Sequence, residues 1–80
     1  VRVRFKKSVV KYTEGDKHSF GFVKSEKQGD DTVMTFLSSS LWGIGNWLLS
    51  FGDCATVESP QRLIDIIKVQ VEKLTQHYSD

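Results

Sequence analysis

Cysteine is nearly absent from this chain of 80 residues, which contains only Cys54. A single cysteine cannot form an internal disulfide, so no disulfide framework stabilises the fold. Such a composition fits a reducing compartment, and we expect the protein to be cytoplasmic. Cys54 falls where a strand is predicted, and no neighbouring residue is of a kind that would activate its thiol. We therefore expect it to be a small core or edge residue.

Long hydrophobic runs are absent as well. No apolar stretch approaches the roughly 18 residues of a membrane span, and nothing resembles a signal peptide. We expect no contact with a membrane. The chain begins Val1-Arg2-Val3, inside a predicted strand and without an initiator methionine. We therefore expect a fragment of a larger protein.

Groups that support catalysis or bind metals are few and scattered. The two histidines, His18 and His77, lie at a predicted strand start and a helix end, without the clustered partners that a metal site needs. Asp30-Asp31 is predicted to be a hairpin tip, and no glycine-rich phosphate-binding loop is present. We expect no enzyme, no cofactor and no metal site.

The chain does contain enough apolar residues for a modest core, with 39% hydrophobic residues and nine aromatics, so we expect one domain over residues 1–80. Its charge is uneven. Residues 1–30 contain eight Lys or Arg against four Asp or Glu, and residues 31–80 contain three against six. The basic part can bind phosphate, or it can be the solvated face of a sheet. The candidate nucleic-acid contacts are Arg2, Arg4, Lys6 and Lys24.

In the first half, Val1, Val3 and Phe5 alternate with cationic residues and predict a half-buried strand. A short helical turn follows, capped by Ser8, with Val9, Val10 and Tyr12 as its apolar members. Strands are predicted over residues 18–26 and 31–37, joined by the hairpin turn Gln28-Gly29-Asp30.

The second half begins with a helix that Ser38, Ser39 or Ser40 can cap and that contains Trp42 and Trp47. Gly43 and Gly45 either admit a close neighbour there or mark an irregular turn. Its apolar face is Leu41, Ile44, Leu48 and Phe51, and Gly52 is a natural stop. A strand then contains Ala55 and Val57.

Ser59-Pro60 predicts the start of a last helix over residues 60–78, with Ser59 as its N-cap. Its apolar stripe is Leu63, Ile67, Val71, Leu74 and Tyr78, widened by Ile64 and Ile66. The order βαββαβα predicts an α+β ferredoxin-like sandwich with an additional C-terminal helix, which can cover the sheet's other face, an edge or a second subunit. We expect one core to contain Val3, Phe5, Leu48, Phe51, Val57, Leu63 and Ile67.

Residues 47–63 also show a family resemblance. The run W-L-L-S-F-G, then A-x-V-x-S-P-x-x-L and a helix ending in Tyr78, resembles the C-terminal extension (WCX domain) of WYL-domain-containing bacterial transcriptional regulators. The resemblance implies a non-catalytic regulatory domain that contributes to dimerisation and effector response. It implies as partners a WYL domain and a DNA-binding winged helix of the same protein, neither of which is in this sequence, and a second copy in a homodimer.

Two other functions remain open. Ser19-Phe20-Gly21-Phe22-Val23 resembles the aromatic strand of the RNA-recognition motif, which would make the chain a single-stranded nucleic-acid-binding domain using Phe20, Phe22 and the basic strand. Against this, the strand comes second instead of third, so both rings can equally fill the core. A ferredoxin-like domain that binds a small ligand is the other alternative.

Self-association is predicted from apolar residues that fall off the main helical stripes, namely Trp42, Leu49 and Val69. Tryptophan is a typical interface anchor, and two-fold pairing is the commonest arrangement of identical chains. We expect a weak symmetric dimer through Trp42 and the outer side of the last helix. Alternatively, both tryptophans complete the core.

Overall fold

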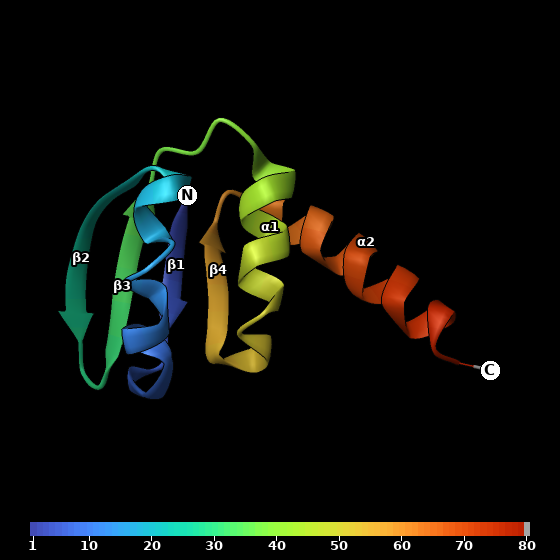
Figure 1. The fold of residues 1–80 in the computed structure, drawn as a ribbon, viewed down its shortest axis with the longest axis horizontal. Coiled ribbons are helices and arrows are strands. Elements are labelled where there is room, and N and C mark those ends of the chain that lie inside the picture. Colours follow the sequence, from blue (N-terminus) through green and yellow to red (C-terminus); the bar gives the residue numbers. More distant parts are fainter. Residues whose placement is uncertain (80) are drawn as a thin grey trace.

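Four antiparallel strands form one sheet in a computed structural model that describes residues 1–79 (Figure 1). The strands are β1 (Arg2–Phe5), β2 (Phe22–Gln28), β3 (Asp31–Phe36) and β4 (Ala55–Ser59), in the spatial order β2-β3-β1-β4. The helices are α1 (Leu41–Leu49) and α2 (Gln61–His77). The predicted α+β fold, with two central strands flanked by β2 and β4 and a C-terminal helix added, is confirmed.

The first crossover contains two 3₁₀ helices, η1 (Lys7–Thr13) and η2 (Lys17–Phe20), in place of one short helical turn. Ser8 does not cap η1, because Lys6 precedes the helix and makes no side-chain cap. Tyr12 is 63% exposed, so it is not an apolar member of this segment, whereas Val9 and Val10 pack against the core.

The strand predicted over residues 18–26 begins only at Phe22, because His18 and Phe20 belong to η2. Gly21 ends η2 in the left-handed conformation, with φ +78°, and turns the chain into β2. The backbone carbonyl of Gly21 accepts a hydrogen bond from the N–H of Leu37 at 2.8 Å, which fixes the start of β2 beside the end of β3.

One core lies between the sheet and the helices on its front face, where Figure 1 shows η1 and α1. Its buried residues are Val3, Phe5, Met34, Phe36, Ile44, Leu48 and Leu63. Phe51, Val57 and Ile67 are partly buried and pack against this cluster, so the predicted core is confirmed. The alternation of β1, with Val3 and Phe5 buried and Arg2 and Arg4 half-buried, is the predicted one.

Helix α1 begins after Ser40, whose hydroxyl oxygen accepts a hydrogen bond from the N–H of Gly43 at 3.1 Å, as an N-cap should.

Cys54 lies in the short 3₁₀ helix η3 (Gly52–Cys54), not in a strand as predicted, because β4 begins at Ala55. The predicted N-cap of α2 is also wrong. Pro60 is the N-cap residue, and Ser59 ends β4 with a cis peptide bond to it.

The start of α2 packs closely on α1, while its far end does not pack at all. Gly45 of α1 is buried beside the start of α2, where a Cβ would lie 3.4 Å from Cδ1 of Leu63, an ordinary contact distance that does not itself require glycine. Leu63 and Ile66 are the buried residues of α2. Beyond them the helix projects away from the sheet (Figure 1).

Candidate interaction surfaces

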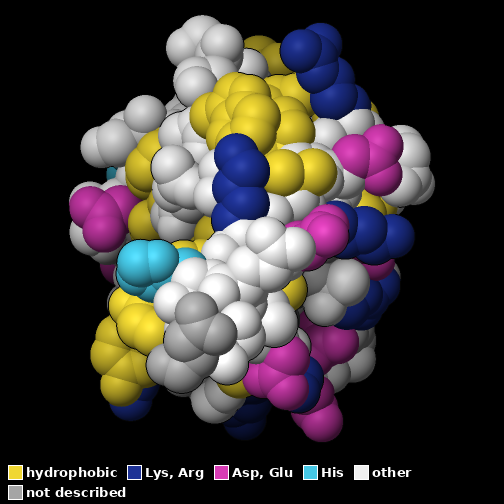
Figure 2. All heavy atoms as spheres, turned by 90° about the vertical axis from the view of Figure 1, so that its right-hand side faces the viewer, with side chains coloured by type: hydrophobic (Ala, Val, Ile, Leu, Met, Phe, Trp, Pro, Cys, Tyr) yellow, Lys and Arg dark blue, Asp and Glu magenta, His cyan; other side chains and the backbone are white. Residues whose placement is uncertain are grey.

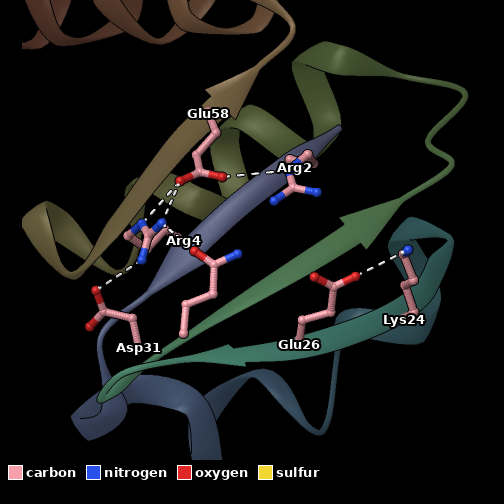
Figure 3. A network of polar contacts seen from close by, with 7 residues as sticks. Arg2, Arg4, Lys24, Glu26, Asp31 and Glu58 are labelled. Atoms are coloured by element: carbon pink, nitrogen blue, oxygen red, sulfur yellow. Dashed lines mark hydrogen bonds and ion pairs between the residues drawn. The ribbon is translucent and has the colours of Figure 1, made fainter.

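The face of the sheet opposite the core carries a network of charged side chains (Figure 3). Arg4 donates from Nε to Glu58 at 3.0 Å and from Nη2 to Oε1 of Gln28 at 2.7 Å, and its Nη1 lies 3.4 Å from Asp31. Arg2 forms a second, longer ion pair with Glu58 at 3.5 Å. The antiparallel pairing of β1 with β4 makes this network, because it places Glu58 beside both arginines.

This network neutralises two of the four cations that were predicted to contact nucleic acid, Arg2 and Arg4. The hydrogen bond to Glu58 is the main reason why the pKa of Arg4 is raised above its ordinary value, so its guanidinium stays charged and paired. Lys24 lies 3.1 Å from Glu26 on β2. Lys6 is exposed just beyond β1. A face on which most cations have an anion within 4 Å exerts only a weak field on phosphate.

The two phenylalanines of the RNA-recognition-like stretch lie on the core side. Phe20 stacks on Trp47, with ring centroids 4.8 Å apart and planes at 17°. Phe22 packs edge-on against Phe36 at 6.0 Å. Both pack against the buried cluster, so neither ring is free on the open face of the sheet to stack on a base. This placement contradicts the premise of the nucleic-acid alternative.

We expect this chain to bind single-stranded DNA only weakly, in fluorescence anisotropy with a labelled oligonucleotide. Such binding should be lost by about 0.2 M salt, because it would depend on released counterions alone. Glu58→Gln should strengthen it at low salt, because it removes the anion that pairs with Arg2 and leaves Asp31 as the anion beside Arg4. Micromolar binding that survives this salt and disappears in Phe20→Ala/Phe22→Ala would contradict the prediction.

A second surface is an apolar pocket of about 260 Å³ between α1, β4 and α2. Its lining residues come from the end of α1 with the following turn, from β4 and from the first half of α2: Leu48, Leu49, Gly52, Ala55, Thr56, Val57, Ile64, Ile67 and Lys68. Lys68 is the one charged side chain in this set. The pocket therefore offers an apolar ligand or side chain a partly enclosed site.

The apolar stripe of α2 continues from this pocket along the projecting half of the helix. Val71 is 47% exposed and Leu74 48%, although their spacing places them on the same helix face as Ile64 and Ile67. Tyr78, the C-cap residue directly after the helix, continues this spacing and is 80% exposed. Figure 2 views the molecule from the side on which α2 projects and shows hydrophobic side chains at the surface among charged ones. We call the five residues Ile64, Ile67, Val71, Leu74 and Tyr78 the α2 stripe.

The three predicted self-association residues are not brought together. Leu49 lines the pocket, Trp42 is 47% exposed in the first turn of α1, and Val69 is 42% exposed on the helix side opposite the α2 stripe. The alternative prediction, that both tryptophans complete the core, is confirmed for Trp47 alone. Its ring packs against Phe5, Phe36 and Phe51. Sequence reasoning did not identify the pocket, because its lining comes from three separate segments.

The reactive side chains each have different neighbours. The Sγ atom of Cys54 has only a weak contact with Asp53, at 3.8 Å. The ring of His18 packs on Phe22, and the ring of His77 packs on Tyr78. Within residues 1–79, no three His, Cys, Asp or Glu side chains gather in a way that could hold a metal ion. None of the helices in that range combines the length and apolar character needed to cross a bilayer.

The fold is that of a ferredoxin-like α+β domain with an added C-terminal helix. The family is shown by comparison: the chain matches the model of the WCX domain over residues 1–75, and it belongs to that family. It is a regulatory C-terminal domain of the WYL type of transcriptional regulator. No curated protein matches the chain.

Proposed function

We propose that this domain assembles its regulator into a homodimer and takes part in the response to an effector. The regulator would bind DNA through a winged helix, sense its ligand in a WYL domain and work in the cytoplasm. The observation that supports this proposal is the α2 stripe, which the domain's own core leaves uncovered from Val71 onward. Contiguous apolar surface of this kind marks interaction sites on soluble domains.

The connection of α2 to the rest of the domain supports a part in the effector response. The same helix contributes Leu63 to the buried core and Val71 and Leu74 to the exposed stripe. A shift of α2 would therefore change both the packing on α1 and the shape of any interface at the far end. A helix that packs at one end and assembles at the other can couple two sites in this way.

The dimer is tested by sedimentation equilibrium over a range of concentrations. We expect the wild type to show a reversible monomer–dimer equilibrium and Val71→Asp/Leu74→Asp to remain monomeric, because a buried unpaired carboxylate costs several kcal/mol (about 3–5 kcal/mol). Both residues are about half exposed, so the melting temperature of the monomer should change little. Val69→Asp is the matched control, with similar exposure on the opposite helix face, and should dimerise normally.

Two results would contradict the proposal. One is a wild type that stays monomeric at every concentration. The other is a Val69→Asp variant that loses the dimer as completely as the stripe variant does.

A small apolar ligand is the second candidate function, and the pocket is the observation that favours it. Its volume of about 260 Å³ is below the range of about 300–1,000 Å³ typical of ligand sites. It is bounded on one side by the α2 stripe, which continues past it into solvent. A site that continues into an exposed apolar helix face suits a protein partner better than an enclosed small molecule.

A further inference from the structure

We infer that two copies of this domain pair through antiparallel α2 helices, with Tyr78 of each copy seated in the apolar pocket of the other. This inference rests on the proposed dimer and specifies its geometry. It starts from the spacing of the α2 stripe. Ile64, Ile67, Val71, Leu74 and Tyr78 are separated by three, four, three and four residues, which is the a/d pattern of a heptad repeat.

A heptad pattern predicts a helix as the partner of this stripe. Apolar residues every 3.5 positions form a narrow seam that packs knobs-into-holes against a second helix, whereas a helix that covers a globular core shows a wider apolar face. The wider part of α2 is its first half, where Leu63 and Ile66 are buried against the domain. From residue 70 onward, the apolar residues are the seam residues Val71, Leu74 and Tyr78 alone.

A two-fold axis between Val71 and Leu74 makes the seam self-complementary. In that register Val71 lies opposite Leu74 of the second copy, and Tyr78 lies opposite Ile67 of the second copy. Ile67 lines the apolar pocket, together with Leu49 of α1. The most exposed residue of the stripe, Tyr78 at 80%, is therefore placed over the pocket, and the two-fold symmetry fills both pockets at once.

The charges flanking the seam fit the same arrangement. The nearest flanking residues are Lys68 and Thr75 on one side and Gln70 and His77 on the other. In the antiparallel register Lys68 faces Thr75 of the second copy, with Glu72 one turn away and within reach of the ammonium group. No like charges face each other, and two equivalent Lys68–Glu72 pairs become available at the rim.

A parallel pairing satisfies fewer of these features. It would place Tyr78 opposite Tyr78 and leave both pockets empty. It would also bring the two domain bodies together at the N-terminal end of α2, where Gln61 and Arg62 are exposed. In the antiparallel pair the bodies lie at opposite ends, and each projecting half-helix enters the space between α2 and α1 of the other copy.

The seam is short, which limits the affinity. It extends over two heptads, fewer than the about three to four that sustain an independent coiled coil. The expected interface is therefore at the small end of specific interfaces, and the dimer should dissociate in the micromolar range or more weakly.

Distances between spin labels distinguish the two pairings. The labels are attached in a Cys54→Ser background at Lys73→Cys, near the proposed axis, or at Gln61→Cys, at the start of α2. Antiparallel helices should place two labels at position 73 about 10–20 Å apart, and two at position 61 about 35 Å apart from the helical rise. Short distances at both positions would overturn this geometry and leave the dimer intact. No dipolar signal at either position, with monomers in sedimentation, would overturn the dimer itself.

The pocket contact is tested by a double-mutant cycle in the same equilibrium. Tyr78→Ala and Leu49→Ala should each weaken the dimer about tenfold. The double variant should lose much less affinity than the product of the two single losses, because both substitutions remove the same contact. Tyr78→Phe should keep most of the affinity, and Ser79→Ala should have no effect. The placement of Tyr78 in the pocket would be overturned if the loss of affinity in the double variant equalled the product of the two single losses. It would also be overturned by a Tyr78→Ala variant that dimerises like the wild type.

Discussion

Replacing Phe5 with alanine is expected to lower the free energy of unfolding by about 3–5 kcal/mol. The side chain is fully buried in β1. Its ring lies 5.5 Å from that of Phe51 and 6.2 Å from that of Trp47, so the cavity would open between the sheet and α1. A domain of this size has a total stability of about 4–12 kcal/mol. The variant should therefore be marginally folded.

Urea unfolding followed by tryptophan fluorescence measures this loss. Tyr12→Ala is the control, because Tyr12 is 63% exposed and its removal should change the free energy by less than about 0.5 kcal/mol. Equal midpoints for the wild type and Phe5→Ala would mean that the aromatic cluster around Trp47 is not the centre of the core.

Gly21→Ala is expected to be at least as damaging, for a different reason. A Cβ at this position would lie 1.9 Å from the carbonyl oxygen of Leu37, which is backbone and cannot move aside without breaking the start of the β2–β3 pairing. The positive φ of +78° adds strain that only glycine avoids. We expect either a loss of more than about 3 kcal/mol or no folded protein.

Gly29→Ala separates these two contributions. Gly29 has a similar φ of +64°, but nothing lies within 4 Å of a Cβ built there. Its substitution should cost only the strain of the left-handed conformation, about 1–2 kcal/mol. Thermal melts of both variants make the comparison. A Gly21→Ala variant no less stable than Gly29→Ala would show that the close contact with Leu37 is absent.

The sequence predicted those elements whose periodicity reflects burial on one face. The alternation around Val3 and Phe5 gave β1, the turn Gln28-Gly29-Asp30 gave the hairpin of β2 and β3, and the helical spacing through Leu48 gave α1. These patterns arise because each element buries one side against the same core, and that side is visible in local sequence.

Features that depend on tertiary contacts were not visible in this way. The 3₁₀ helix η2 replaces the first residues of the predicted strand because Gly21 must approach Leu37, a residue distant in sequence. The basic strand predicted a cationic surface, but Glu58 joins Arg2 and Arg4 only through the pairing of β1 with β4.

The candidate interaction surface was predictable in part for the same reason. The apolar spacing along α2 showed that Val71, Leu74 and Tyr78 share a face, but not that the domain itself covers this face only as far as Ile67. Trp42 and Val69 were predicted as interface residues because they fall off the main helical stripes. The structure leaves these two residues exposed and part of the main stripe as well, and local sequence could not indicate the exposure of the stripe.

The most direct test of the central claim, that the α2 stripe is the surface of self-association, is a dilution series of ¹H–¹⁵N correlation spectra. As the concentration rises, we expect amide shifts to change along residues 68–79 and around the pocket at Leu49 and Gly52. The amides of the open sheet face, at Arg2, Arg4 and Glu26, should stay fixed. Spectra that do not depend on concentration, or shifts confined to the sheet face, would contradict the account.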